Sequence, residues 1–256
     1  MNRTESVAAA RWFFLSMLLL LLIWEGVCRL FAIPPFILPP PTLVLLSLWD
    51  LRQQLFGIHL WVTLREVSVG LIIAIFFGAG LSIAMTCSRV VERLVYPYIV
   101  ISQTIPIIAL SPIFILWFGY DLSGKIAVTL LFTFFPIVVS MYDGLRSADP
   151  EMVNLLRTMG ATRKQIFCKL QIPASLPHFF SGLKVAATYS VAGATIGEWL
   201  GSSAGLGYFG RRASGNFQAP ALFASVVLLS LMGILLFWIV TLVEKRFLKT
   251  RHHSQK

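Results

Sequence analysis

Apolar and polar positions fall in long blocks along this chain, not in the short alternation of a soluble fold. Apolar stretches that approach the roughly 20 residues needed to cross a bilayer recur six times. Short polar segments separate most of them, and one longer polar segment, residues 143–177, follows the fourth. The pattern predicts an all-α, polytopic membrane protein with about six transmembrane helices. These expected spans cover about residues 12–33, 67–86, 94–120, 126–142, 178–200 and 220–243.

Two of the expected spans carry a small residue at every fourth position. Residues four apart share one helix face, and a small face lets two helix backbones approach closely in lipid. The pattern therefore predicts packing surfaces on both spans. The small residues are Gly70, Ala74, Gly78 and Ser82 in the second span, and Gly182, Ala186, Ser190 and Ala194 in the fifth.

The third expected span is uncharged but carries three prolines, Pro97, Pro106 and Pro112. Proline lacks the backbone N–H and breaks the helical hydrogen-bond pattern. Such breaks are tolerated at membrane depth only where protein or a watery cavity satisfies the backbone. These breaks therefore suggest the lining of a pathway, and a kinked helix that only packs is an equal alternative. Glu198, near the end of the fifth span, is a second candidate, and its alternative is a pair with Arg211 or Arg212. Candidate pathway or gate residues are Gln103, Thr104, Pro106, Ser190 and Glu198.

The segment around the first span has its own local signals. Glu25 and Arg29 are four residues apart, so they share a helix face and can pair. A proline cluster at residues 39–41 then ends the helix. Residues 42–65 read as an amphipathic surface segment that does not cross the membrane.

Composition supports a membrane protein of one domain, residues 1–256. The chain is 57% hydrophobic and 12% charged, with a mean hydropathy of +0.80, whereas soluble domains average about 25% charged residues. Its net charge of +10 is better explained by membrane orientation than by nucleic-acid binding. Fourteen of the 21 Lys and Arg residues lie on the side of the termini and of the 143–177 segment. This bias predicts an inner-membrane protein with both termini and that segment in the cytoplasm.

No catalytic or metal-binding group is evident. The three cysteines form no Cys-x-x-Cys pair, and the four histidines have no ligand-like neighbours. Residues 119–126 resemble a phosphate-binding loop, but Ile126 replaces the hydroxyl residue that would bind magnesium. We therefore predict a chain that is not an enzyme and carries no cofactor.

The 143–177 segment carries start and stop signals for short helices. Asp149, Pro150 and Glu151 form a strong helix start. Gly160 suits the left-handed position that ends a helix, and residues 162–165 offer a capping box for a second helix.

The first of these short helices has an apolar face that no lipid would cover. Such a face is typical of a docking surface for a cytoplasmic partner, and folding back onto this chain is the alternative. Its residues are Met152, Leu155, Leu156 and Met159.

At this point the chain resembles the permeases of bacterial binding-protein-dependent ABC importers. Gly160, nine further residues and then Leu170-Gln171-Ile172-Pro173 look like the second half of their signature, E-A-A-x(3)-G-x(9)-I-x-L-P. The acidic start is missing, because Asn154, Leu155 and Leu156 occupy those positions. Further resemblance to the nitrate, taurine and aliphatic-sulfonate group lies in residues 36–42, 117–119, 182–186 and 205–208. Residues 193–199 look more like the subgroup that imports thiamin pyrimidine precursors.

The resemblance implies a type I importer architecture in which residues 143–177 carry a coupling helix. It implies a cytoplasmic ABC ATPase dimer holding ATP and magnesium, a second permease copy, and a periplasmic or lipid-anchored substrate-binding protein. The implied solute is small and polar or anionic: a thiamin pyrimidine precursor or similar heterocycle, or a sulfonate, taurine or nitrate. The implied coupling residues are Asp149, Pro150, Glu151, Asn154, Leu155, Leu156, Met159, Gly160, Leu170, Ile172 and Pro173.

Two other classes of function remain as alternatives. An ion-gradient-driven secondary carrier would work without a partner, but few charged residues lie where a span would couple ions. An intramembrane enzyme is disfavoured because no paired acid–base or metal-ligating groups occur in the spans.

Overall fold

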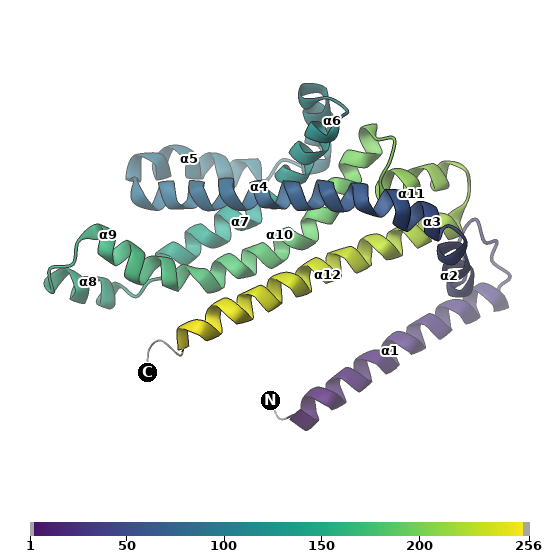
Figure 1. Cartoon of the computed structure of the whole chain (residues 1–256), viewed down its shortest axis with the longest axis horizontal. Coiled ribbons are helices and arrows are strands. Elements are labelled where there is room, and N and C mark those ends of the chain that lie inside the picture. Colours follow the sequence, from purple (N-terminus) through teal and green to yellow (C-terminus); the bar gives the residue numbers. More distant parts are fainter. Residues whose placement is uncertain (1–2, 253–256) are drawn as a thin grey trace.

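The computed structural model describes residues 3–252, and all of its regular elements are helices (Figure 1). The tail residue Lys256, which the orientation argument counted, lies outside the described residues. In chain order the helices are α1 (Arg3–Leu30), α2 (Pro41–Asp50), α3 (Arg52–Gln54), the π-helical turn η1 (Leu55–His59), α4 (Leu60–Cys87), α5 (Arg89–Ser102), α6 (Ile107–Phe118), α7 (Leu122–Arg146), α8 (Pro150–Thr158), α9 (Arg163–Ile166), the π-helical turn η2 (Phe167–Gln171), α10 (Ile172–Gly201), α11 (Leu206–Gly215) and α12 (Ala219–His252).

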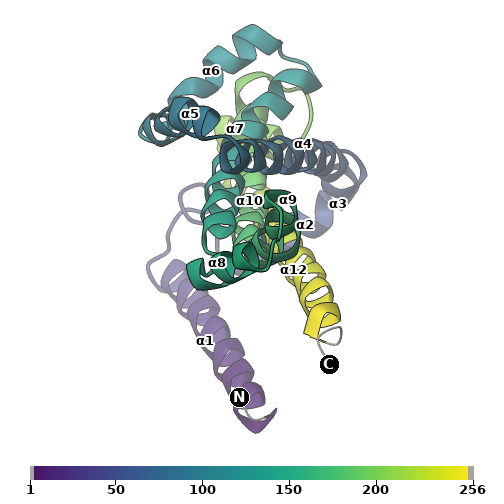
Figure 2. The ribbon, with the colours of Figure 1, turned by 90° about the vertical axis from the view of Figure 1, so that its left-hand side faces the viewer.

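The centre of the fold is α7, which packs along α10 on one side and α4 on the other (Figures 1 and 2). Small residues bring these helices together. A Cβ added at Gly70 would lie 2.6 Å from the Thr129 side chain of α7, and one added at Gly182 would lie 2.5 Å from the Pro136 carbonyl oxygen. All eight residues of the two small-residue faces are buried, so the prediction of two packing surfaces is confirmed.

Within the described residues, three helical stretches are long and apolar enough to cross a membrane: Arg52–Cys87, Leu122–Arg146 and Ala219–Leu248. The first corrects the expected boundary between a surface segment at 42–65 and a span at 67–86. Only α2 remains a separate helix there, because the chain continues from α3 through η1 into α4 without a break. Glu66 is a charged residue within this long stretch, and its charge is compensated there because it is buried and paired with Lys125.

The third expected span, 94–120, is not one kinked helix. The helices α5 and α6 meet at a break of 109° and form a broken span or a re-entrant loop. Pro97 and Pro112 stay inside their helices, and the chain breaks before Pro106, since proline disfavours helical backbone in the residue before it. Hydroxyl groups add hydrogen bonds to backbone carbonyls at the end of α5: the Ser102 hydroxyl donates to the Ile99 oxygen at 2.8 Å, and the Thr104 hydroxyl donates to the Ile101 oxygen at 2.7 Å.

The first helix, α1, diverges from the other helices in both views (Figures 1 and 2). Its attachment is at its C-terminal end, where Arg29 and Glu25 pair at 2.6 Å as predicted. Glu25 also accepts hydrogen bonds from the Thr42 amide (3.1 Å) and hydroxyl (2.9 Å), which fixes the start of α2 beside the end of α1.

Candidate functional site

The loop between α7 and α10 contains the helices that its sequence predicts. The Asp149 side chain caps α8 by accepting the Glu151 amide at 2.9 Å, with Pro150 in the first turn. Gly160 has φ +81°, a left-handed conformation that glycine adopts without strain. Thr162 and Gln165 form the expected capping box at the start of α9. The local predictions for this loop are therefore confirmed.

The apolar face of α8 is open. Met152, Leu155 and Met159 are 47%, 53% and 74% exposed, while Leu156 is half-buried. Asn154 is exposed beside them, at the position of the missing acidic signature residue. The later residues Leu170, Ile172 and Pro173 are half-buried where the loop returns into α10. The loop thus presents an apolar surface on α8, which lies in the chain between the core helices α7 and α10.

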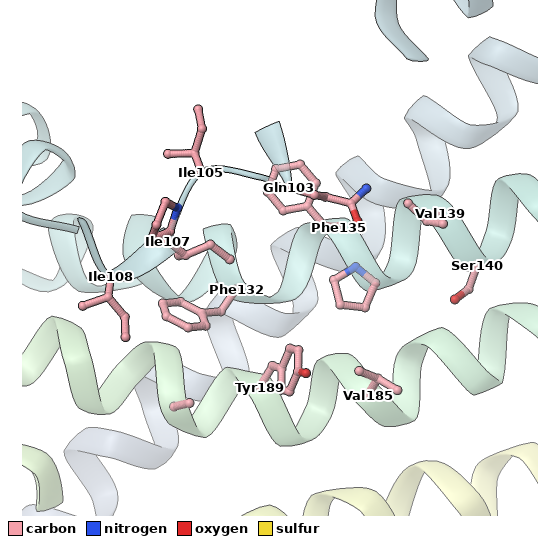
Figure 3. Close-up of a pocket in the computed structure, with 13 residues that line it drawn as sticks. Gln103, Ile105, Ile107, Ile108, Phe132, Phe135, Val139, Ser140, Val185 and Tyr189 are labelled. Carbon is pink, nitrogen blue, oxygen red and sulfur yellow. The ribbon is translucent and has the colours of Figure 1, made fainter. Parts of the chain in front are cut away.

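A cavity of about 710 Å³ lies where the α5–α6 break faces α7 and α10 (Figure 3). Its volume is in the range of small-molecule sites, about 300–1,000 Å³. The residues that line it are Gln103, Ile105, Pro106, Ile107, Ile108, Phe132, Phe135, Pro136, Val139, Ser140, Val185, Tyr189 and Ala192.

The lining of this cavity is aromatic and uncharged. Phe132, Phe135 and Tyr189 contribute rings, and the polar side chains are those of Gln103, Ser140 and Tyr189. Pro136, inside α7, has no N–H to donate to the Phe132 carbonyl four residues earlier. That oxygen is therefore left without its usual helical donor.

The five pathway residues suggested by the sequence lie in three different places. Gln103 and Pro106 line the cavity. Thr104 is exposed at the α5–α6 break and does not line it, and Ser190 is buried with its hydroxyl bonded to the Ala187 oxygen at 2.7 Å. Glu198 is buried in a separate polar cluster.

Sequence reasoning missed the rings of the cavity. Aromatic residues in an apolar span do not indicate which face meets a cavity. The available signal was Pro136, which, like Pro106, lacks a backbone donor within an expected span and lines the same cavity.

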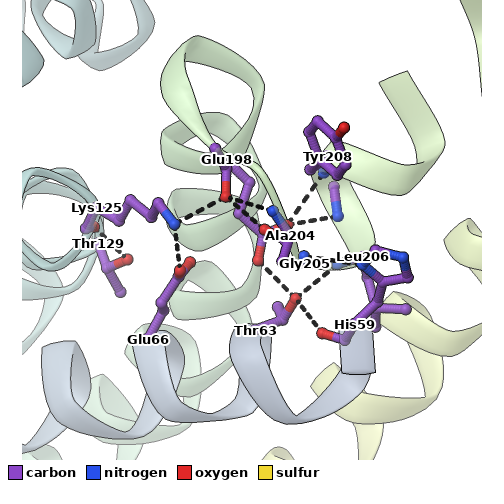
Figure 4. Close-up of polar contacts among 12 residues, drawn as sticks. His59, Thr63, Glu66, Lys125, Thr129, Glu198, Ala204, Gly205, Leu206 and Tyr208 are labelled. Atoms are coloured by element: carbon purple, nitrogen blue, oxygen red, sulfur yellow. Dashed lines mark hydrogen bonds and ion pairs between the residues drawn. The ribbon is translucent and has the colours of Figure 1, made fainter. Parts of the chain in front are cut away.

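The polar cluster around Glu198 joins α4, α10 and α11 (Figure 4). Glu198 accepts hydrogen bonds from the Thr63 hydroxyl at 2.5 Å and from the Gly207 and Tyr208 amides at 2.5 and 3.2 Å. It therefore caps the N-terminus of α11, where backbone amides favour a carboxylate. These contacts differ from the pairing with Arg211 or Arg212 that the sequence suggested. Gly205, with φ +119°, lies directly against the carboxylate, where a Cβ would meet it.

An ion pair that the sequence did not predict lies beside this cluster. Lys125 lies 3.0 Å from the Glu66 carboxylate and donates a 2.8 Å hydrogen bond to the Ser202 hydroxyl (Figure 4). All three residues of the charged core, Glu66, Lys125 and Glu198, are buried. The expected spans 94–120 and 126–142 leave Lys125 in the loop between them, within the pattern that resembles a phosphate-binding loop. It lies instead in the first turns of α7.

Among the residues that the structure describes, no group of three or more His, Cys, Asp or Glu side chains is arranged to hold a metal ion. The described cysteines are all free; Cys28 is buried, while Cys87 and Cys168 are exposed.

Comparison with known proteins relates this arrangement to transport. Residues 70–249 match the family described as binding-protein-dependent transport system inner membrane component. The chain is 47% identical over 237 residues to the formylaminopyrimidine transport permease protein ThiX of Halalkalibacterium halodurans, covering 93% of this chain and 94% of that one. It is 31% identical to the riboflavin transport system permease protein RibX of Chloroflexus aurantiacus, covering 90% and 86%.

The fold resembles a solved structure of the MetNI methionine ABC transporter in an inward-facing conformation. The TM-score is 0.65 at 20% identity, and the match covers 78% of this chain and 97% of that one. This likeness supports the type I importer architecture expected from the sequence.

Proposed function

Because this chain belongs to the family of binding-protein-dependent transport system inner membrane components, and so is the permease subunit of an ABC importer, we propose that it imports a formylaminopyrimidine or a closely similar pyrimidine. The observation that carries this proposal is the 47% identity to a formylaminopyrimidine permease along nearly the full length of both chains. A sulfonate, taurine or nitrate is the competing solute class from the sequence. The uncharged lining of the cavity favours the heterocycle over these solutes, each of which carries a charged group.

The chain works in this proposal as the non-catalytic membrane part of a larger complex. Two permease copies enclose the pathway, and a binding protein delivers the solute from outside. A cytoplasmic ATPase dimer supplies ATP hydrolysis and receives α8 at its surface. The open apolar face of Met152, Leu155 and Met159 supports this contact, because burying such side chains on a partner is favourable.

The test is uptake by proteoliposomes that hold this permease with the ATPase and binding protein encoded beside it. Labelled formylaminopyrimidine should enter only when ATP and the loaded binding protein are both present. Leu155→Asp should abolish uptake and release the ATPase on co-purification, since it places a charge on the apolar face of α8. Gly160→Pro should lower uptake while the protein still inserts.

A matched control is Ile234→Asp on the exposed surface of α12, which is far along the chain from the coupling loop. It should retain the ATPase on co-purification if it inserts. Uptake driven by a sodium or proton gradient with this chain alone would overturn the proposal in favour of a secondary carrier. ATP-driven uptake of taurine but not of the pyrimidine would overturn the substrate assignment alone.

A further inference from the structure

The rings around the cavity come from two helices whose backbones are in close contact. A Cβ added at Gly193 of α10 would lie 2.9 Å from the Thr129 Cα and 3.1 Å from the Phe132 Cβ of α7. Because the two backbones touch at Gly193, Phe132 and Tyr189, which is one turn from Gly193, lie side by side on neighbouring helices. The cavity is therefore bordered by rings on two closely packed helices.

These side chains project into the space between the broken span and the core. Figure 3 shows the Phe132 and Tyr189 rings between α7 and α10, with Gln103 and Phe135 on the side of the α5–α6 break. Tyr189 is half exposed, so its ring face is free for contact. Aromatic rings interact favourably with other flat π systems in offset or edge-to-face geometry. The arrangement is suited to a flat ring system.

The polar groups of the cavity are neutral and can both donate and accept. The Gln103 amide carries two donors and an acceptor, and its nitrogen has a long contact of 3.5 Å to the Ile99 carbonyl. An aminopyrimidine edge also presents a donor beside an acceptor, which matches a side-chain amide. No Lys, Arg or His lines the cavity, so a desolvated anion would meet no compensating charge.

We propose that this cavity is a transient binding site for a neutral, planar nitrogen heterocycle during its passage. Phe132 and Tyr189 contact the ring faces, and Gln103 binds the edge that carries the ring nitrogen and amino group. This inference deepens the proposed function and rests on it for the substrate class. It adds a selective contact within the permease itself, apart from the binding protein.

The experiment measures binding to the purified permease–ATPase complex without the binding protein, by equilibrium dialysis with labelled formylaminopyrimidine. Wild type should bind it saturably, and excess taurine should not displace it. Tyr189→Leu keeps apolar bulk but removes the ring, and it should weaken binding about tenfold, since the face on which the heterocycle stacks is lost. Tyr189→Phe should stay within about twofold of wild type, because it keeps the ring face that the site uses.

Two further variants separate a binding contact from a packing effect. Tyr98→Leu removes an equally sized, exposed ring from α5 outside the cavity and should not change binding. Gln103→Leu should weaken binding, whereas Gln103→Asn should retain part of it.

The outcomes distinguish this inference from the function it rests on. Absence of saturable binding, or equal binding by wild type, Tyr189→Leu and Gln103→Leu, would overturn the site even if ATP-driven uptake of the pyrimidine is normal. Displacement by taurine would also overturn it, because the site would then accept a non-planar solute that carries full charges. Failure of the uptake experiment itself would instead remove the proposed substrate.

Discussion

Two buried carboxylates of this chain are stabilised in different ways, one by neutral hydrogen-bond donors and the other by an opposite charge. Glu198 is satisfied mostly by neutral donors, namely the Thr63 hydroxyl and the first amides of α11. Glu66 relies on Lys125, and its carboxylate oxygens have no directed hydrogen bond among the described residues. Without Lys125, the buried Glu66 carboxylate would be left as an uncompensated charge, which is strongly destabilising. We therefore expect the stability of the protein to depend more on Lys125 than on any one of the donors to Glu198.

We expect Lys125→Met to lower the thermal stability of the detergent-solubilised protein strongly, because breaking a buried ion pair costs about 3–5 kcal/mol. The double variant Glu66→Leu with Lys125→Met should recover most of that loss, since it removes both charges of the pair and leaves neither uncompensated. The control is Arg146→Met, which breaks the more exposed pair with Glu92 and should cost about 1 kcal/mol or less. Equal losses in the single and double variants would show that Lys125 contributes packing and not charge.

Residues with local signals could be predicted, and residues with distant partners could not. Asp149, Gly160 and Thr162 each act on backbone within three residues, so the sequence pattern contains the whole interaction. Glu66 and Lys125 belong to different helices, and the residues that flank each of them in the sequence do not indicate its partner. The pair becomes visible only when α4 and α7 are packed together.

At the level of helices, close approach depends on where a small residue faces a neighbour. Gly193 lies against the α7 backbone, whereas Gly80, in the middle of α4, has open space where a Cβ would lie. Both are glycines inside long helices, and they differ only in this environment. The contrast isolates packing from helix propensity.

Gly193→Ala should destabilise the protein by about 1–3 kcal/mol, since its Cβ would meet Thr129 backbone that cannot give way. Gly80→Ala should be neutral or stabilising by about 0.5–1 kcal/mol, because alanine loses less backbone freedom in a helix. The midpoints of thermal unfolding of the two purified variants give the comparison. A loss of stability in Gly80→Ala as large as that in Gly193→Ala would contradict the packing explanation.

The third expected span shows why element predictions fail at prolines. Pro97, Pro106 and Pro112 look alike in the sequence, yet the chain turns sharply only before Pro106. Near that break, the Ser102 and Thr104 hydroxyls donate hydrogen bonds to backbone carbonyls, and the Ser102 carbonyl accepts the Ile105 amide at 3.3 Å. The result depends on the partners of each freed group, which a count of prolines does not contain.

Across the whole molecule, the loop between α7 and α10 and the cavity are linked by the same two helices. The loop begins where α7 ends and returns to the core at the start of α10, and both helices line the cavity. A displacement of α8 would thus reach Phe132 and Tyr189 through two helices in close contact. The sequence predicted the short helices of this loop, but not that the flanking helices would also form the cavity.

The orientation of the molecule can be tested with its own cysteines. Cys87 is the last residue of α4, and Cys168 lies in the loop between α7 and α10; both are exposed. Cys28 is buried near the C-terminal end of α1. Because the Lys and Arg bias favours a cytoplasmic loop, variants that keep only Cys87 or only Cys168 should react with a membrane-impermeant maleimide in inside-out vesicles and not in intact spheroplasts. A variant that keeps only Cys28 should react in neither until the protein is denatured. Reaction of Cys168 in intact spheroplasts would place α8 outside the cell, where it could not meet an ATP-hydrolysing partner.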